Sequence, residues 1–407
     1  MNTAAQPAIP RHILPVIVLS QFAATSLWFA VNAVMPDLQQ AWGWPATAVG
    51  TLTAAVQLGF VAGTLVFALL MVADRFSPSQ VFLVCALAGA ALNAATLAVQ
   101  GQLSLLVALR FGVGFLLAGI YPVGMKIAAS WYRERLGPVL GVLIGALVLG
   151  TALPHGLRAL AGDAGPLAGA GLPPWQNVVL GVSLLAALGG LATGLLVPDS
   201  PHLQRGARVS PKALTLIWHD RRLRASVFGY FGHMWELYAF FVLVPLIVAS
   251  RLSGSALSAT AFWVIAAGVA GCVGGGLLTR RWGSARVAQV LLGTSGLCCL
   301  AAPFMLVAPW PLFMGWLLLW GLSVSGDSPQ FSTLTAQNSP PAVVGSVLTF
   351  VNCLGFAISA LSIELFVGAV QHAPLAAVLP WLGLGPLLGL WMFRPLTSAR
   401  APASARA

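Results

Sequence analysis

The chain has 407 residues, of which 58% are hydrophobic and 7% are charged, and its mean hydropathy is +0.90. This composition excludes an ordinary set of soluble domains and indicates a protein that crosses a membrane many times. The formal net charge of +11 is compatible with a nucleic-acid-binding protein, but the positions of the basic residues argue against that function.

Twelve apolar segments are each long enough to cross a bilayer as a helix. The sequence therefore predicts an all-α membrane protein with twelve transmembrane helices. The segments cover residues 13–34, 50–72, 80–99, 103–130, 137–157, 175–197, 225–249, 257–279, 287–308, 312–336, 342–368 and 374–393.

The basic residues give these helices an orientation. If the N-terminus is cytoplasmic, 16 basic residues fall on the cytoplasmic side, while Arg158 and Arg251 fall outside. Cytoplasmic loops of membrane proteins are enriched in Lys and Arg, so both termini are predicted to be cytoplasmic, in a bacterial inner membrane. We attribute the positive charge to topology and to anionic lipid, and expect no nucleic-acid partner. The cytoplasmic set is Arg11, Arg75, Arg133, Arg135, Arg205, Arg208, Lys212, Arg221, Arg222, Arg224, Arg280, Arg281, Arg286, Arg394, Arg400 and Arg406.

A basic polar stretch at residues 198–224 divides the twelve segments into six and six. The predicted organisation is an N-terminal six-helix bundle at 1–197, a cytoplasmic linker at 198–224, and a C-terminal six-helix bundle at 225–407. A short interfacial helix is expected in the linker from Pro211 onward.

The two predicted bundles also repeat each other in sequence, which indicates an ancient duplication of a six-helix unit. Three pairs of short motifs are separated by 206 to 210 residues. The pairs are GFLLAGIYP at 114–122 with GLSVSGDSP at 321–329, ADRFS at 73–77 with TRRWG at 279–283, and SLW at 26–28 with ELY at 236–238.

The segment 225–249 carries His233 and Glu236 near its centre. An ionised side chain at the bilayer centre costs about 2.5 to 3.5 kcal/mol, so Glu236 is expected to face protein or water. The two residues are three apart and share a helix face with Gly229 and Phe240. We expect this face to line a transport pathway; the alternative is a buried pair that only holds this helix to a neighbour.

No catalytic signature accompanies these groups. The five cysteines fall inside apolar runs, which indicates small core residues and neither a disulfide framework nor a zinc cluster. The sequence contains no nucleotide-binding loop, zinc signature or nucleophile elbow. We therefore expect no enzymatic activity, no cofactor and no metal site.

The layout, the central basic loop and the junction ALLMVADRFSPSQ at 68–80 resemble the major facilitator superfamily. Asp74 and Arg75 match the acid and arginine of its Gly-x-x-x-Asp-Arg-x-Gly-Arg-Arg loop, while Leu70 replaces its first glycine. RFGVG, from Arg110, is similar to the family's Arg-x-x-x-Gly element. The resemblance implies a cytoplasmic gate formed by Asp74, Arg75, Arg133, Glu134 and Arg135; the alternative is a set of ordinary surface ion pairs.

The resemblance further implies two pseudo-symmetric bundles whose first, fourth, seventh and tenth helices line a central cavity. A carboxyl in a partly dry cavity can bind and release a proton, so Glu236 and Asp327 are the expected coupling residues, with His233 as a relay. Arg110 either binds an anionic substrate group or neutralises one of those carboxyls. The expected substrate-binding residues are Arg110, Gln21, Trp28, Asn32, His233, Tyr238, Ser325 and Gln330.

The sequence thus predicts a monomeric secondary transporter that moves a small molecule by alternating access, coupled to protons and surrounded by lipid. An anionic substrate is expected if Arg110 binds it. A drug and proton antiporter is one alternative. Gly137, Gly141 and Gly145 only partly match the signature of that subgroup, because Ala146 and Leu149 depart from it. A receptor of the same fold without turnover is the other alternative, and it differs only in flux.

Overall fold

The computed structural model describes residues 9–132, 136–161, 174–203, 210 and 212–397, and all regular secondary structure in this part of the chain is helical. We call the elements α1 to α9 the N-terminal half. They are α1 (Ile13–Thr25), η1 (Ser26–Phe29), η2 (Asn32–Val34), α2 (Met35–Trp42), α3 (Ala48–Leu69), α4 (Val72–Arg75), α5 (Pro78–Ala94), η3 (Ala95–Ala98), α6 (Leu103–Leu117), α7 (Tyr121–Trp131), α8 (Leu136–Ala161) and α9 (Pro174–Leu196).

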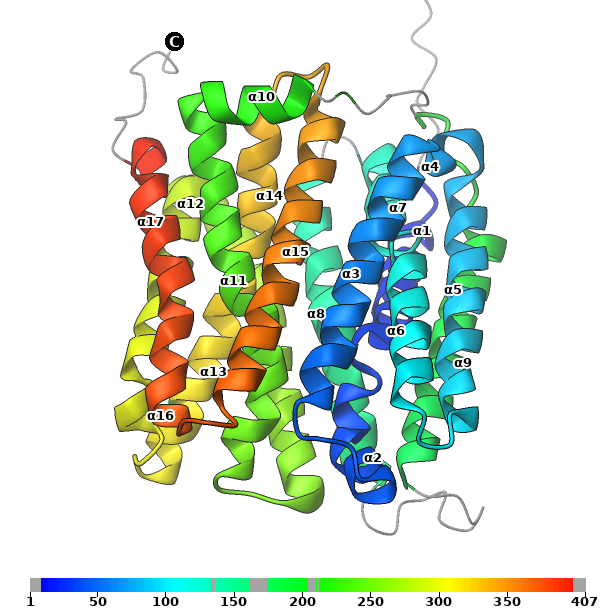
Figure 1. The fold of residues 1–407 in the computed structure, drawn as a ribbon. Helices are drawn as coiled ribbons and strands as arrows, with labels where there is room; N and C mark the ends of the chain where they lie inside the picture. The colour runs from blue at the N-terminus through cyan, green and yellow to red at the C-terminus, as the bar shows by residue number, and fades with distance from the viewer. Residues whose placement is uncertain (1–8, 133–135, 162–173, 204–209, 211, 398–407) are drawn as a thin grey trace, which may run out of the picture.

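The C-terminal half, α11 to α17, stands beside the first with its helices roughly parallel to them (Figure 1). The expected linker helix is present as α10 and lies across one end of the C-terminal half, next to α11 and α15 (Figure 1). The elements are α10 (Lys212–His219), α11 (Arg221–Ala249), α12 (Gly254–Met305), α13 (Trp310–Gly326), α14 (Ser328–Gln337), α15 (Val344–Ala369), α16 (Leu375–Val378), η6 (Leu379–Gly383) and α17 (Leu384–Thr397).

Nine helices of the described residues are long and apolar enough to cross a membrane, and the bent pair Ile13–Phe29 and Asn32–Trp42 gives a tenth. The 52-residue α12 is one of the nine, but its backbone leaves the helical region at Gly283, where φ is 75°. It therefore contains two of the predicted segments. The broken pair α13 and α14 covers the predicted segment 312–336. The structure is consistent with twelve crossings in this way.

The repeated motif marks the same helix break in both halves. The fourth span ends its first helix at Leu117 and restarts at Tyr121, and the tenth is broken at Asp327. Each break precedes a proline, Pro122 or Pro329, which lacks a backbone N–H and crowds the carbonyl four residues earlier. In the C-terminal half the carbonyl freed by Pro329, that of Ser325, lies 3.3 Å from the thiol sulfur of Cys272, which donates to it.

The first glycine of the motif has the same packing role in both halves. A Cβ atom added to Gly114 of α6 would clash with the carbonyl oxygen of Val56 on α3. One added to Gly321 of α13 would clash with the carbonyl oxygen of Val264 on α12. Only glycine permits so close a crossing. The duplication inferred from sequence is therefore also a repeated helix contact.

The two halves meet along two pairs of neighbouring helices. α3 packs against α15 (Figure 1), and α8 packs against α12. The five cysteines are free and buried, as expected for small core residues. The space between these pairs is where residues of both halves approach each other and where a central site would form.

Candidate functional site

A small cavity of about 20 Å³ lies between the two halves. Its lining among the described residues is aromatic, aliphatic or hydroxyl-bearing, with no charged side chain. That volume holds about one water molecule, so an organic substrate fits only if the halves separate. The lining residues are Tyr121, Ile144, Leu147, Val148, Tyr230, Met234, Leu237, Tyr238, Phe241, Ser325, Ser328, Ser332 and Phe356.

A cluster of stacked rings joins the first span to this cavity. The Trp28 ring stacks on Tyr238, with centroids 5.8 Å apart, and on Phe356, with centroids 5.3 Å apart. Its indole Nε1 donates to Oε1 of Gln57 over 3.2 Å. Phe60 packs against Phe356 with centroids 4.4 Å apart. Trp28 thus belongs to one half and both its stacking partners at the cavity belong to the other.

Glu236 is fully buried and its carboxylate accepts hydrogen bonds from neutral groups. Trp320 Nε1 lies 2.6 Å from Oε1, Ser295 Oγ lies 2.8 Å from Oε2, and Cys299 Sγ lies 3.2 Å from Oε1. These donors come from α12 and α13, so the carboxyl is enclosed within the C-terminal half. None of these three partners is a cation. In the part of the chain that the structure describes, Glu236 therefore pairs with neither Arg110 nor His233, the two partners considered from the sequence.

His233 instead faces Asp327. Nδ1 of the imidazole lies 2.8 Å from Oδ1 of the carboxyl, and both side chains are fully buried. The two atoms are at ion-pair distance. Asp327 is also the break between α13 and α14, where its backbone carbonyl accepts from the N–H of Gln330 over 2.9 Å. A titratable pair therefore sits at a discontinuity of the tenth span.

Arg110 is buried, with 1% of its surface exposed, and it serves the backbone of the first span. Its Nη2 donates to the carbonyls of Leu27 and Trp28, each over 2.7 Å, and Nη1 donates to Oδ1 of Asn93 over 3.2 Å. The first span bends by 49° just beyond these carbonyls. A break in a membrane helix frees carbonyls that need another donor, and Arg110 supplies it. Neither expected role of Arg110, anion binding or neutralising a carboxyl, is among these contacts.

The face of α11 that meets the cavity differs from the one expected. Tyr230, Met234 and Tyr238 line the cavity, whereas the face of Glu236 packs into its own half. There Gly229 lies against Phe331, and the Phe240 ring lies 4.5 Å from that of Trp320. The expectation that Gly229, His233, Glu236 and Phe240 line the pathway is corrected: they lie behind the cavity-facing side of the helix.

The other expected substrate residues are spread over several places. Tyr238 and Ser325 line the cavity. Asn32 Nδ2 donates to Thr53 Oγ1 over 2.7 Å, while Gln21 and Gln330 are buried away from the lining. The sequence reading missed Tyr121, Tyr230, Met234 and Phe356. Tyr230 and Met234 precede the predicted Tyr238 at intervals of four residues, which keeps all three on one helix face, so this spacing was a signal available for two of the missed positions.

Of the five residues expected to form the cytoplasmic gate, the structure describes Asp74 and Arg75. Asp74 on α4 pairs with Lys126 on α7, whose Nζ lies 2.8 Å from Oδ1 and donates to the carbonyl of Ala73 over 2.7 Å. Arg75 is exposed. Arg133, Glu134 and Arg135 lie outside the described residues. Lys126 was not among the gate residues expected from the sequence.

A family model described as Major Facilitator Superfamily matches residues 17–363 of the chain. No curated protein sequence matches the chain. Three solved structures share its fold over nearly the whole length. The human organic anion transporter MFSD10 (TETRAN) has 17% identity and a TM-score of 0.71, with 95% of this chain and 100% of that chain covered.

The second is a bacterial homolog of the human lysosomal transporter Spinster, in an inward-facing and unoccupied conformation. It has 13% identity and a TM-score of 0.68, with 97% and 96% covered. The proton:xylose symporter XylE bound to 6-bromo-6-deoxy-D-glucose has 12% identity and a TM-score of 0.73, with 94% of each chain covered. The TM-scores show that these proteins share the fold of this chain, and at identities this low they do not identify its substrate.

Proposed function

The chain belongs to the Major Facilitator Superfamily, and we propose that it is a proton-coupled transporter of a neutral or cationic organic molecule with aromatic or apolar surface. The family and the transporters of the same fold indicate a transporter rather than an enzyme. In the proposed orientation, α10 and both termini face the cytoplasm of a bacterial cell, as the distribution of Arg and Lys requires.

The composition of the central cavity is the observation that carries this proposal. Tyr121, Tyr230, Tyr238 and Phe356 supply rings, and Ser325, Ser328 and Ser332 add hydroxyls. Aromatic faces bind apolar surface and attract cations, while hydroxyls can orient a weakly polar group. The cavity becomes substrate-sized when the two halves rock apart about the aromatic cluster of Trp28, which is the alternating-access movement proposed here.

An anionic substrate is less well supported. It would need a cation at the cavity, and Arg110 already donates to two carbonyls and to Asn93. One structure of the same fold is named as an organic anion transporter, so anions remain a necessary arm of the test. The proposal depends on the uncharged lining, and a positive result with anions would overturn this part of it.

Glu236 and Asp327 are the proposed proton-coupling residues. Glu236 accepts from neutral donors, so it can gain a proton without leaving an unpaired cation in the interior. Asp327 can share a proton with His233, which stands one helical turn from Glu236 on α11. Protonation of either acid changes the net charge on the side of α11 that faces away from the cavity. We propose that this change alters the packing of α11 and so couples proton binding to the substrate cavity.

Ligand classes can be separated with purified protein by a thermal-shift screen. Tetraphenylphosphonium, ethidium and neutral aromatic compounds should raise the melting temperature, because a ligand of the folded state stabilises it by mass action. Sugars and aromatic carboxylates should leave it unchanged. Hits are then tested for uptake into proteoliposomes with a pH gradient. Stabilisation and flux by carboxylates alone would establish the anion alternative, and tight binding without flux would establish a receptor.

Glu236→Gln tests the coupling. The amide keeps the shape and the acceptor for Trp320 but cannot change charge, so accumulation driven by a pH gradient should be lost while exchange without a gradient persists. Glu364→Gln, on α15 and exposed, removes an acid of a membrane span without touching the cavity and should accumulate substrate normally. Full accumulation by a stable Glu236→Gln protein would remove Glu236 from the mechanism and leave Asp327 to be tested.

A further inference from the structure

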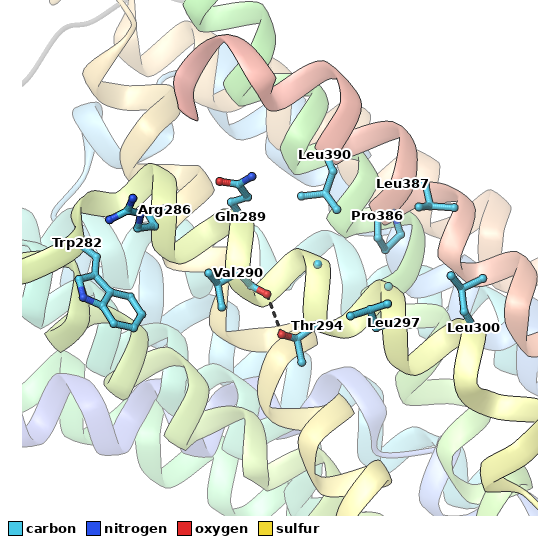
Figure 2. Close-up of a pocket in the computed structure, with 12 residues that line it drawn as sticks. Trp282, Arg286, Gln289, Val290, Thr294, Leu297, Leu300, Pro386, Leu387 and Leu390 are labelled. Carbon is cyan, nitrogen blue, oxygen red and sulfur yellow. Dashed lines mark hydrogen bonds between the residues drawn. The ribbon is translucent and has the colours of Figure 1, made fainter. Parts of the chain in front are cut away.

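A groove of about 840 Å³ lies on the outer surface of the C-terminal half and shares no lining residue with the central cavity. It runs between the second part of α12 and α17 (Figure 2). Gly293 and Gly296 have no side chains to fill it, and Leu297, Leu387 and Leu390 form apolar walls. Thr294 turns its hydroxyl to the carbonyl of Val290 over 2.8 Å, so it adds no free polar group (Figure 2).

The groove is polar at one end only. Trp282, Arg286 and Gln289 lie toward one end of the row, and Leu300 and Leu387 lie toward the other (Figure 2). Arg280 and Arg281 precede this end and are exposed, and residues 279–300 contain no acidic side chain. In the proposed orientation this end faces the cytoplasm, where tryptophan and arginine commonly meet the headgroup layer of the membrane.

The length of the groove fits one leaflet. From Arg286 to Leu300 the helix rises by about 21 Å at about 1.5 Å per residue. Half of a typical hydrocarbon core is about 15 Å thick, so a molecule anchored at Arg286 would extend its apolar part through its own leaflet. The volume of the groove lies within the range of specific ligand sites, about 300 to 1,000 Å³.

We propose that this groove is a binding site for one anionic phospholipid of the cytoplasmic leaflet, with its phosphate at Arg286 and an acyl chain along Gly293, Leu297 and Leu390. A guanidinium pairs with phosphate through parallel hydrogen bonds, and basic pockets between membrane helices suit such headgroups. The bound lipid would brace α12 against α17. The opposite side of α12 carries Ser295 and Cys299, the donors to Glu236.

Two variants test the two ends of the site. Arg286→Gln removes the charge from an exposed position, and Gly293→Leu fills the groove. A Cβ at Gly293 would find only Leu390 Cδ1, 3.9 Å away, so the added side chain has room. Native mass spectrometry of the full chain with palmitoyl-oleoyl phosphatidylglycerol or phosphatidylcholine gives the readout. Wild type should retain the anionic lipid preferentially, Arg286→Gln should bind it about fivefold more weakly, and Gly293→Leu should not retain it.

Matched controls are available on the same chain. Gly315→Leu adds the same side chain at an exposed, open glycine of α13 outside the groove. Arg11→Gln removes an exposed cytoplasmic charge from the other half. Both should retain phosphatidylglycerol like wild type. Equal retention of the two lipids, or unchanged retention in both groove variants, would overturn the proposal. So would a dimer that Gly293→Leu dissociates, because a second copy would then be the occupant.

Discussion

The two halves share a helix arrangement but differ in the charges they bury. In the N-terminal half, Arg110 holds the carbonyls of the broken first span, and the break in the fourth span carries the apolar Ile120. In the C-terminal half, the equivalent break carries Asp327, paired with His233, and Glu236 is enclosed nearby. Trp28 and Tyr238, matched in the repeat, stack on each other across the boundary.

This difference separates permanent charge from exchangeable charge. An arginine stays protonated, so it can hold backbone groups in place throughout a cycle. Carboxyl and imidazole groups can gain or lose a proton, so their charge changes when a proton binds. The N-terminal half also pairs Arg158 of α8 with Asp37 of α2 through two contacts of 2.9 Å. We infer that the charges of the N-terminal half hold its helices in a fixed arrangement, whereas those of the C-terminal half change when a proton binds.

The largest effect is expected from Arg110→Leu. The substitution leaves two carbonyls and Asn93 Oδ1 without their donor, and each such buried group costs about 1 to 3 kcal/mol. The protein should lose about 3 kcal/mol or more of stability, seen as a much lower melting temperature and poor yield. Lys126→Met, on a partly exposed basic residue of the same half, should cost less than about 1 kcal/mol. A stable Arg110→Leu protein that has lost only anion binding would reverse our assignment.

Asp327→Asn should affect coupling more than folding. Asparagine keeps the size of the buried side chain and still offers an oxygen to His233, so the stability loss should stay near about 1 kcal/mol. Accumulation driven by a pH gradient should nevertheless fall strongly, measured as uptake in proteoliposomes beside the melting temperature. A collapse of stability equal to that of Arg110→Leu would show that the two halves use their buried charges alike.

Tyr238→Ala tests whether the aromatic cluster contacts the substrate. One aromatic contact is worth about 0.5 to 1.5 kcal/mol, so affinity should weaken by roughly two- to tenfold, measured by titration calorimetry. Tyr238→Phe keeps the ring and its stacking on Trp28, and should bind nearly as well as wild type. Unchanged affinity in the alanine variant would move the substrate away from this boundary between the halves.

The smallest effect is expected at the cytoplasmic end of the N-terminal half. Asp74→Asn breaks a partly exposed pair with Lys126, so stability should change by less than about 1 kcal/mol. The transport rate should fall while ligand affinity remains within a few-fold, because Asp74 lies far from the cavity. Lys126→Met should slow transport to a similar extent. Loss of ligand binding in either variant would place the pair in the site instead of the gate.

The membrane spans, their orientation and the duplicated unit depend on the local composition of the chain. Hydropathy located the spans, and the unequal distribution of Arg and Lys predicts their orientation. The motif shared by residues 114–122 and 321–329 predicted a duplicated unit, and the structure places a helix break and a close crossing at Gly114 and Gly321 in both copies. Each of these signals is local, because bilayer thickness and proline chemistry act on a single segment.

Partners across the fold could not be read in the same way. Residues 225–249 are apolar on nearly every side, so their pattern does not show which face turns to the cavity. Neighbouring helices decide that rotation, and they turn Tyr230, Met234 and Tyr238 to the boundary and Glu236 toward Trp320. Arg110 could be recognised as a costly buried charge, but its acceptors lie 82 and 83 residues away on a helix whose break was not predicted.

The sequence by itself thus determined the membrane class, the family and the presence of buried charge, and it predicted twelve crossings, with which the structure is consistent. Tertiary structure alone decided that the arginine braces a broken helix, that the acids stand behind the cavity, and that α12 and α17 enclose a groove. The reason is physical. Transfer of a segment into a membrane depends on its own composition, whereas each buried contact depends on helices that the chain brings together from distant positions.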